Sequence, residues 1–252
     1  MTTRSNADSP QHLGERVRSI PIAKEPGSHS HKQATAPAPT RSERIARVVN
    51  IVLASAGLVV AAPLMLIAAI LVKLSSPGPV FYAQARVGLD RRRGTGSGPY
   101  DRRTRDLGGR PFMILKFRTM RTDAEKNGAV WASRRDTRVT NVGRVLRKYR
   151  IDELPQLVNV IRGEMNIVGP RPERPSIFSR LCDDIAEYPL RQRARPGITG
   201  WAQVNQAYDT SIEDVRTKVR YDLEYIERQG VAEDLKIMAR TVPVMIFRKG
   251  GW

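Results

Sequence analysis

The chain has 252 residues, which is enough for one hydrophobic core with a smaller additional segment. Its formal net charge of +18 at pH 7 predicts anionic partners, a class that includes nucleic acid, anionic lipid headgroups and phosphorylated substrates. The single cysteine, Cys182, excludes an intramolecular disulfide, and the histidine and cysteine content excludes a His/Cys metal cluster, although carboxylates could still hold a hard cation.

Residues 1–40 are rich in Ser, Thr, Pro, Gln and His and have no apolar periodicity, which predicts a disordered polar tail. The run that follows, "ARVVNIVLASAGLVVAAPLMLIAAILVKLSSPGP", has no charged residue between Val48 and Val72. A straight helix of that length would cross a hydrocarbon core of about 30 Å. Residues 41–74 are therefore predicted to be a membrane helix, and the simplest arrangement is a single spanning helix.

Two features favour instead a re-entrant helix, which returns to the membrane face that it entered. Pro63 lies in the middle of the apolar run, where it removes a backbone hydrogen bond and predicts a kink. Basic residues flank the run on both sides, and the positive-inside rule then places both flanks on the same side of the membrane. These residues are Arg41, Arg44 and Arg47 before the run and Lys73, Arg86 and residues 91–93 after it.

Residues 75–252 have the pattern of a globular domain. The stretches "GPVFYAQARVG" and "RPFMILKFRTM" alternate apolar and polar side chains, which predicts the two strands of a small β-hairpin. The Gly- and Arg-rich stretch between them, at residues 89–110, is predicted to be a flexible, solvated loop and is a candidate contact with anionic headgroups.

Helices are predicted at four places in this domain. "TNVGRVLRKY" is a short basic helix, and "DELPQLVNVIRGE" has apolar residues at helical spacing before Gly163, which fits a C-terminal stop. Two amphipathic helices follow in "SIEDVRTKVRYDLEYIERQG" and "VAEDLKIMARTVPVMIFRKGGW", and their core stripes are expected to be Val215, Val219, Leu223 and Ile226, then Leu235, Met238 and Val242. The predicted fold class is α+β and mostly helical, with a membrane-embedded re-entrant helix broken at Pro63 joined to a compact cytoplasmic domain.

Two adjacent carboxylates, Asp152 and Glu153, stand in the stretch "RIDELPQL" of this basic chain. On local sequence Asp152 lies at or beside a helix N-cap with Pro155 in the first turn, since aspartate and proline are favoured at those positions. The alternative is a catalytic carboxylate pair that the surrounding positive charge serves. Local sequence leaves both interpretations open.

Several motifs occur in a specific order: "SPGPVFYAQARVG", "KFRTM", "DELPQLVNVIRGEMNIVGPRP", "PGITGWAQVN" and "RYDLEYI...DLKIM.RTV". In this order, behind a proline-broken apolar run, they resemble the bacterial sugar transferases. These are monotopic polyprenyl-phosphate hexose-1-phosphate transferases, also called phosphoglycosyl transferases of the small-domain type. The resemblance covers the chain from Arg44 to the C-terminus, with two departures: the longer loop at residues 89–110, and Gln206 where the family commonly has glycine.

The resemblance implies transfer of a hexose-1-phosphate from a UDP-sugar to polyprenyl phosphate, usually undecaprenyl phosphate, with release of UMP. The product would start the synthesis of a glycan such as exopolysaccharide, capsule or O-antigen. The family has a re-entrant helix broken at a proline, which matches Pro63, and its catalytic domain lies on the cytoplasmic face of the inner membrane. It uses Mg²⁺ and a covalent intermediate on the aspartate of an Asp-Glu pair, which matches Asp152 and Glu153.

This chemistry gives the basic residues a role, because a carboxylate attacks an anionic phosphate readily only when cations neutralise the charge. Asp152 and Glu153 are the expected Mg²⁺ ligands, and Glu153 either helps to hold the metal or accepts a proton from polyprenyl phosphate. The expected phosphate and substrate contacts are Lys116, Arg118, Arg147, Arg171 and Asp222. The alternative to a site role is a surface lysine for Lys116, and a surface salt bridge for Asp222 and Asp234.

Two other functions fit parts of the sequence. A nucleic-acid-binding membrane protein would explain the positive charge, but no recognised binding module and no aromatic residues interleaved with the arginines accompany it. A non-catalytic scaffold of a glycan-assembly complex would not explain the Asp-Glu pair. The expected partners are therefore a UDP-sugar, polyprenyl phosphate and membrane lipid, without nucleic acid; a homo-oligomer or a glycan-assembly complex is a further expectation. The sequence leaves the transferred sugar open.

Overall fold

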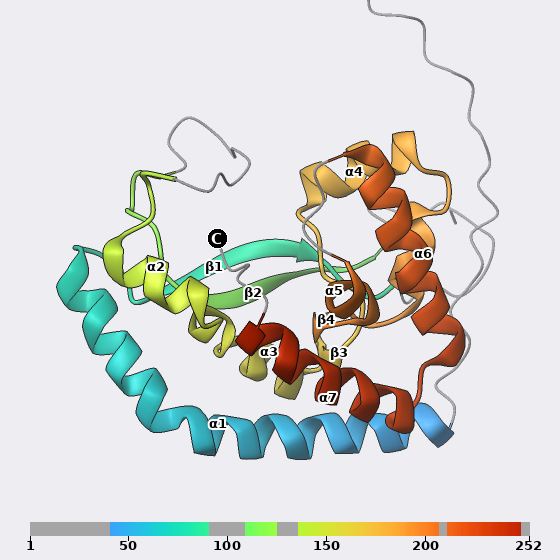
Figure 1. Ribbon diagram of the computed structural model, residues 1–252, viewed down its shortest axis with the longest axis horizontal. Coiled ribbons are helices and arrows are strands. Elements are labelled where there is room, and N and C mark those ends of the chain that lie inside the picture. Colours follow the sequence, from blue (N-terminus) through green and yellow to red (C-terminus); the bar gives the residue numbers. More distant parts are fainter. Residues whose placement is uncertain (1–40, 91–108, 125–135, 207–210, 248–252) are drawn as a thin grey trace, which may run out of the picture. The chain divides into compact units, whose positions relative to one another are not determined.

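The computed structural model describes residues 41–90, 109–124, 136–206 and 211–247, with side chains for all of these except 41, 42 and 245–247. The predicted polar tail and most of the predicted Gly- and Arg-rich loop lie outside the described residues. The described part of the chain is mostly helical, with two two-stranded sheets, so the predicted α+β class is confirmed (Figure 1). In chain order the elements are α1 (Arg41–Ser75), β1 (Phe81–Val87), β2 (Pro111–Phe117), α2 (Asn141–Lys148), the 3-10 turn η1 (Ile151–Glu153), α3 (Gln156–Arg162), β3 (Asn166–Val168), α4 (Pro175–Asp184), the 3-10 turn η2 (Tyr188–Arg193), β4 (Gly197–Thr199), α5 (Trp201–Asn205), α6 (Ile212–Arg228) and α7 (Val231–Phe247).

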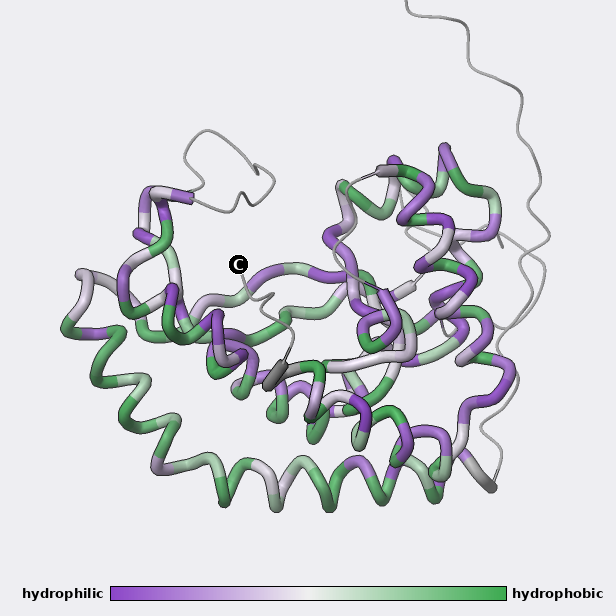
Figure 2. Tube along the Cα trace, in the orientation of Figure 1, coloured by the Kyte–Doolittle hydropathy of each residue, from purple (hydrophilic) through white to green (hydrophobic). Residues whose placement is uncertain are grey.

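Helix α1 is the apolar segment, and by length and composition it could cross a membrane. Figure 2 shows that its trace is predominantly hydrophobic. Its axis turns part-way along in Figure 1, and Pro63 is the proline inside it, where the missing backbone N–H weakens the helix. Many of its apolar side chains are exposed, with Val59 at 75% and Val60 at 81%. This surface is available for contact with lipid.

Both ends of α1 are bonded to the same globular domain. Near its start, Arg47 donates to two carbonyl oxygens in the last turn of α3, at 2.6 and 3.0 Å. Just after its end, the carbonyl oxygens of Ser76 and Pro77 each accept a hydrogen bond of 2.7 Å from Arg118, which follows β2. Carbonyl groups in and just after the last turn of a helix have few intrahelical donors, so these two arginines supply hydrogen bonds that water or another cap would otherwise provide.

Strands β1 and β2 pair antiparallel, with Phe81 opposite Phe117 and Tyr82 opposite Lys116. Both predicted strands are therefore confirmed. Neighbouring side chains on a strand point to opposite faces, so Phe117 and Lys116 meet different surroundings. Phe117 is buried in a cluster that includes Val72 of α1, and its ring stacks on that of Phe81 at 5.2 Å between centroids. Lys116 is left on the other face.

The four predicted helices of the domain are present as α2, α3, α6 and α7. Thr140 caps α2 by accepting a hydrogen bond from the Gly143 N–H at 2.9 Å. Helix α3 ends at Gly163, whose φ of 83° lies in the left-handed region that favours glycine. The parallel pair β3–β4 and the short elements α4, η2 and α5 were not predicted. Elements this short contain too few residues to show a clear apolar periodicity.

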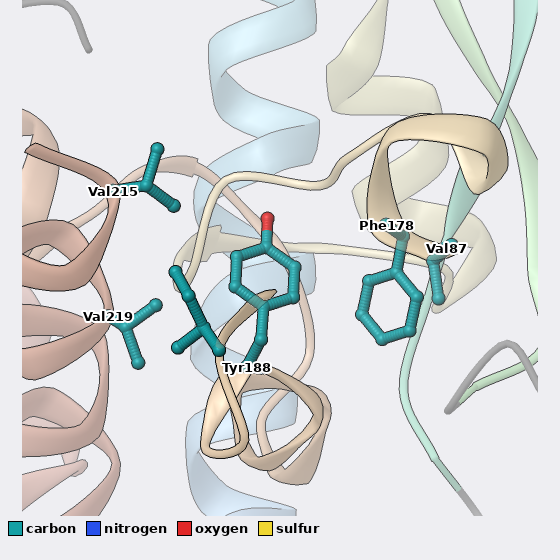
Figure 3. Packing of buried hydrophobic residues seen from close by; sticks show 6 residues of the cluster. Val87, Phe178, Tyr188, Val215 and Val219 are labelled. Carbon is teal, nitrogen blue, oxygen red and sulfur yellow. The ribbon is translucent and has the colours of Figure 1, made fainter. Parts of the chain in front are cut away.

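One part of the core lies between β1, α4, η2 and α6. Val215 and Val219, which belong to the predicted stripe of α6, are buried in one cluster with Val87, Phe178 and Tyr188. Figure 3 shows the Tyr188 ring lying between these two valines on one side and Phe178 and Val87 on the other. The stripe of α6 is therefore confirmed at these two positions.

The predicted core stripe of α7 is wrong at Leu235 and Val242, which are 51% and 57% exposed. The inward face of α7 instead includes Ile237, which is fully buried. It shares this face with Asp234 and Thr241, whose side chains bond to neighbouring hydroxyl groups at 2.8 Å. The stripe of α7 was predicted from apolar residues alone, so the prediction could not include Asp234 and Thr241, which also face inward.

Replacing Arg118 by lysine should destabilise the fold. Lysine lacks the planar guanidinium that bonds two carbonyl oxygens at once. We expect the Arg118→Lys variant to lose about 1.5–3 kcal/mol in the free energy of unfolding, measured by denaturant unfolding in detergent. The matched control is Arg121→Lys, because the Arg121 side chain is 68% exposed. An Arg118→Lys variant as stable as the parent chain would contradict the anchoring role and favour the phosphate contact predicted from sequence.

Candidate active site

The two adjacent carboxylates lie in η1, the tight turn between α2 and α3. Asp152 and Glu153 are buried, at 7% and 6% exposure. The turn begins after Arg150, which has φ 57° and ψ 17° and is therefore in the left-handed region without being glycine. This conformation is costly for a residue with a Cβ, and such backbone strain clusters at functional sites.

Of the two interpretations left open for Asp152, the helix cap is wrong. Helix α3 begins at Gln156 and Pro155 occupies its N-cap position, with no side-chain cap. The Oδ1 atom of Asp152 is buried and has no hydrogen-bond partner among the described residues. A buried carboxylate oxygen without a donor is unusual and needs an explanation, for which a bound ligand is the natural candidate.

Three cations hold the Glu153 carboxylate. Lys116 Nζ lies 2.8 Å and Arg171 Nη2 3.0 Å from Glu153 Oε1, and Arg150 Nη1 lies 3.6 Å from Oε2. Burial alone would raise the pKa of Glu153, but Lys116, Arg171 and Arg150 hold this pKa well below its usual range. Glu153 is therefore ionised at neutral pH.

The pKa of Asp152 is shifted in the opposite direction to that of Glu153. Burial, and then the adjacent Glu153 carboxylate, raise the pKa of Asp152 to about 6, while Lys116, Arg147 and Arg150 oppose the increase. Two neighbouring carboxyl groups with pKa values pushed apart in this way are typical of an active site. At neutral pH the Asp152 carboxylate is charged, buried and poorly solvated, which suits a nucleophile.

The structure brings together three of the five predicted phosphate contacts. Lys116 and Arg171 meet at Glu153. Arg147 is close enough to oppose the rise in the pKa of Asp152, and its Nε donates to the Thr119 hydroxyl at 2.8 Å. The alternative for Lys116, a surface lysine, is wrong, because the side chain is 17% exposed and ion-paired.

The other predicted residues bond elsewhere. Arg118 is bonded to the carbonyl groups after α1, and Asp222 is ion-paired with Arg191 at 2.6 Å. Asp222 therefore forms a salt bridge, as the alternative to a substrate contact expected, but the Asp222–Arg191 pair is buried and not on the surface. Asp234 accepts a hydrogen bond from Tyr225 at 2.8 Å in the protein interior, so the surface salt bridge considered for it is wrong.

Two further arginines contact the site residues and were not predicted from the sequence: Arg150 pairs with Glu153, and Arg191 donates to the Arg171 carbonyl oxygen. Arg150 closes the basic stretch before the carboxylates, but a left-handed arginine has no sequence signature. Arg191, which is 1% exposed, lies in a stretch with no periodicity to place it. Neither residue had a local signal that would have found it.

The described residues contain no group of three or more His, Cys, Asp or Glu side chains that could hold a metal ion. Mg²⁺ needs fewer protein ligands when substrate phosphates supply the rest, and one or two carboxylates then suffice. Asp152 fits this requirement through its unbonded Oδ1, whereas Glu153 Oε1 already has two cationic partners. The residues present therefore fit a cation that the substrate also coordinates.

The backbone strain at Arg150 is testable by two substitutions that both remove its guanidinium. Arg150→Gly removes the Cβ that disfavours the left-handed region, whereas Arg150→Ala keeps it. We expect the glycine variant to be more stable than the alanine variant by about 1 kcal/mol, or a melting temperature about 2–4 °C higher in detergent. Equal melting temperatures would mean that position 150 is unstrained.

Comparison with known proteins places this site in a family. A model of the family described as bacterial sugar transferase matches residues 41–248. The UDP-N-acetylgalactosamine-undecaprenyl-phosphate N-acetylgalactosaminephosphotransferase of Aeromonas hydrophila is 40% identical over 202 residues, covering 80% of this chain and 44% of that protein. The UDP-glucose:undecaprenyl-phosphate glucose-1-phosphate transferase of Caulobacter vibrioides is 42% identical over 202 residues, covering 79% of this chain and 69% of that protein.

A third relative matches over most of its own length. The exopolysaccharide production protein ExoY of Sinorhizobium fredii is 36% identical over 221 residues, covering 82% of this chain and 87% of that protein. The chain thus spans less than half of the Aeromonas relative but most of the other two. With the family model matched over residues 41–248, the chain belongs to the bacterial sugar transferase family.

Proposed function

We propose that this protein transfers a hexose-1-phosphate from a UDP-sugar to undecaprenyl phosphate and releases UMP. The observation that carries the proposal is the buried Asp152 carboxylate, with an unbonded oxygen, beside a Glu153 held by three cations. The names of the Aeromonas and Caulobacter relatives support the donor and acceptor classes. Those names differ in the sugar, so the proposal leaves the sugar open. The name of the Sinorhizobium relative favours exopolysaccharide as the glycan that the product starts.

The proposed reaction has two displacements at one phosphorus atom. In the first, an Asp152 oxygen bonds to the phosphorus that carries the sugar, and the bond from this phosphorus to the UMP oxygen breaks, so that UMP leaves with the electron pair. In the second, a phosphate oxygen of undecaprenyl phosphate bonds to the same phosphorus, and the bond to Asp152 breaks. The carboxylate is regenerated and the product is undecaprenyl-diphosphate-sugar.

Fixed positive charge makes the first displacement feasible. A carboxylate and a diphosphate repel each other, and Lys116, Arg147 and Arg150 all act on the Asp152 carboxylate electrostatically. Arg171 adds a guanidinium that is 31% exposed and so can reach a ligand while it pairs with Glu153. Ion pairs and hydrogen bonds within the protein hold these groups in place, so little reorganisation is needed when charge develops.

The lowered pKa of Glu153 bears on its role. A group that is ionised well below neutral pH is a weak proton acceptor at pH 7. This argues against proton transfer, one of the two roles that the sequence left open for Glu153. Because Glu153 Oε1 already has two cationic partners, Mg²⁺ would be held chiefly by the unbonded Oδ1 of Asp152, with Glu153 beside it and the substrate phosphates as further ligands, and would neutralise the donor diphosphate.

The proposed topology is re-entrant, with both flanks of α1 and the catalytic domain on the cytoplasmic face of the inner membrane. The attachments of Arg47 to α3 and of Arg118 to the segment after α1 support it, because one globular domain binds both ends of the helix. The exposed apolar residues around Pro63, including Val59 and Val60, would then lie deepest in the bilayer. Helix α3, which follows the Asp-Glu turn, packs on α1 and would keep the carboxylates near the headgroups of the acceptor lipid.

The nucleophile is tested by Asp152→Asn, which keeps the side-chain shape but removes the attacking oxygen anion. With purified protein, UDP-sugars, undecaprenyl phosphate and Mg²⁺, we expect UMP release to fall by about 1,000-fold or more. Mass spectrometry should detect no sugar-phosphate adduct on the variant. The control is Asp183→Asn, an exposed aspartate of α4 that should keep full activity. An Asp152→Asn variant that still forms the adduct would place the nucleophile elsewhere, and a parent chain that releases no UMP from a broad donor panel would favour a scaffold.

The re-entrant topology is tested by cysteine labelling in a Cys182→Ser background. Single cysteines replace the exposed residues Arg44 and Leu74 at the two flanks of the apolar run. A membrane-impermeant maleimide should label both in inverted inner-membrane vesicles and neither in intact spheroplasts. Val60→Cys, in the apolar middle, should stay unlabelled in both preparations. Labelling of the two flanks from opposite sides would establish a spanning helix instead.

A further inference from the structure

The loop at residues 169–174, "GPRPER", carries Arg171 to Glu153. Backbone hydrogen bonds at Gly169 and Pro170 tie the first part of this loop to β4. The backbone at Arg171 itself is held differently, by a side chain from η2. Arg191 Nη2 donates to the Arg171 carbonyl oxygen at 3.0 Å.

Arg191 is a buried arginine with three partners. It is 1% exposed, its Nε donates to Asp222 Oδ2 at 2.6 Å, and its Nη1 donates to the Tyr188 hydroxyl at 2.7 Å. The guanidinium also lies 4.8 Å from the centroid of the Tyr188 ring, which is itself fixed in the apolar cluster of Figure 3. The planar guanidinium is therefore held through Nε and Nη1, and its Nη2 group points to the Arg171 carbonyl oxygen.

We propose that Arg191 is a positioning residue for the sugar-phosphate transfer proposed above, on which this inference rests: held by Asp222 and Tyr188, it fixes the Arg171 backbone so that the Arg171 guanidinium stays on Glu153. Asp222 then acts through Arg191 and Arg171, in place of the substrate contact predicted for it from sequence. Neither Arg191 nor Asp222 touches the donor or the acceptor.

A stabilising role alone is a poor explanation for this ion pair. Moving two charges from water into the interior costs about as much as their attraction returns, so apolar residues of similar size often serve stability as well. An apolar pair at these two positions would, however, leave the Arg171 carbonyl without its donor. The property that only the charged pair supplies is a directed hydrogen bond to that carbonyl.

The rest of the loop has attachments of its own. Lys218 of α6 pairs with Glu173 at 3.0 Å, and Arg86 of β1 donates to the Pro172 carbonyl at 2.9 Å. These contacts involve neither Arg191 nor Asp222, so we expect them to remain when either residue is changed. Loss of the Arg191 bond should therefore displace Arg171 without releasing the loop.

A double-mutant cycle tests the proposal. Arg171→Gln removes the guanidinium at Glu153, and Asp222→Asn removes the charge that holds Arg191 while keeping the side-chain shape. We expect each change to lower UMP release on the order of 100-fold, through kcat more than KM, because misplacing an active-site group by about 1 Å has effects of that size. The double variant should be no slower than Arg171→Gln alone, because both changes remove the same interaction.

Arg191→Lys is the second variant, because lysine keeps the buried positive charge but cannot hold three partners in one plane. It should also add nothing to the loss caused by Arg171→Gln. The matched control is Lys218→Gln, which removes another α6 contact to the same loop and should add its full, smaller effect to that of Arg171→Gln. Losses for Asp222→Asn or Arg191→Lys that multiply with those of Arg171→Gln would overturn the proposal.

The cycle also separates this inference from the proposed function. A parent chain that releases no UMP from any donor would remove the proposed function. The same cycle, measured on the free energy of unfolding, then tests the structural part of the inference: coupling between positions 171 and 222 supports the hold of Arg191 on the Arg171 backbone, and additive losses overturn it.

Discussion

The Glu153 carboxylate between Lys116 and Arg171 is the interaction on which the site depends. Its three partners come from β2, from the loop after β3, and from the strained residue that opens η1. Lys116 is 37 residues and Arg171 is 18 residues from Glu153 along the chain, so this one ionised side chain links distant segments at the candidate site. It also determines the state of its neighbour, because its negative charge helps to raise the pKa of Asp152.

Strand β2 and helix α3, which flank the site, also hold the apolar helix α1. Lys116, near the end of β2, pairs with Glu153. Two residues later, Arg118 binds the segment after α1. Helix α3 follows η1 directly, and Arg47 of α1 binds its last turn. Asn159 joins α3 to β2, since its amide donates to the Met113 carbonyl and accepts from the Leu115 N–H. The position of α1 and the position of the carboxylates are therefore coupled, and under the proposed topology the depth of α1 in the bilayer would set the height of the carboxylates.

The large positive charge has more than one use. An excess of basic residues suggests anionic ligands, and Lys116, Arg150 and Arg171 do surround carboxylates at the site. Two buried arginines, Arg118 and Arg191, instead bond to backbone carbonyl oxygens. Guanidinium groups suit this task because they offer several donors in one plane and stay charged when buried. Net charge alone therefore overstates how many arginines meet a substrate.

The sequence by itself determined the apolar segment with its proline, the strands β1 and β2, the helices α2 and α3 with the end of α3 at Gly163, and the pair Asp152–Glu153 with Lys116 and Arg171 as candidates. These features depend on periodicity, capping residues and motif order, which act over a few neighbouring residues. Only the tertiary structure decided that Asp152 caps no helix, that Arg118 and Asp222 bond away from the carboxylates, and that Arg150 contacts Glu153 and Arg191 contacts the Arg171 backbone. The physical reason is distance along the chain: Lys116 and Glu153 are 37 residues apart and Arg191 and Asp222 are 31 apart, so packing, not local sequence, selects which charges meet.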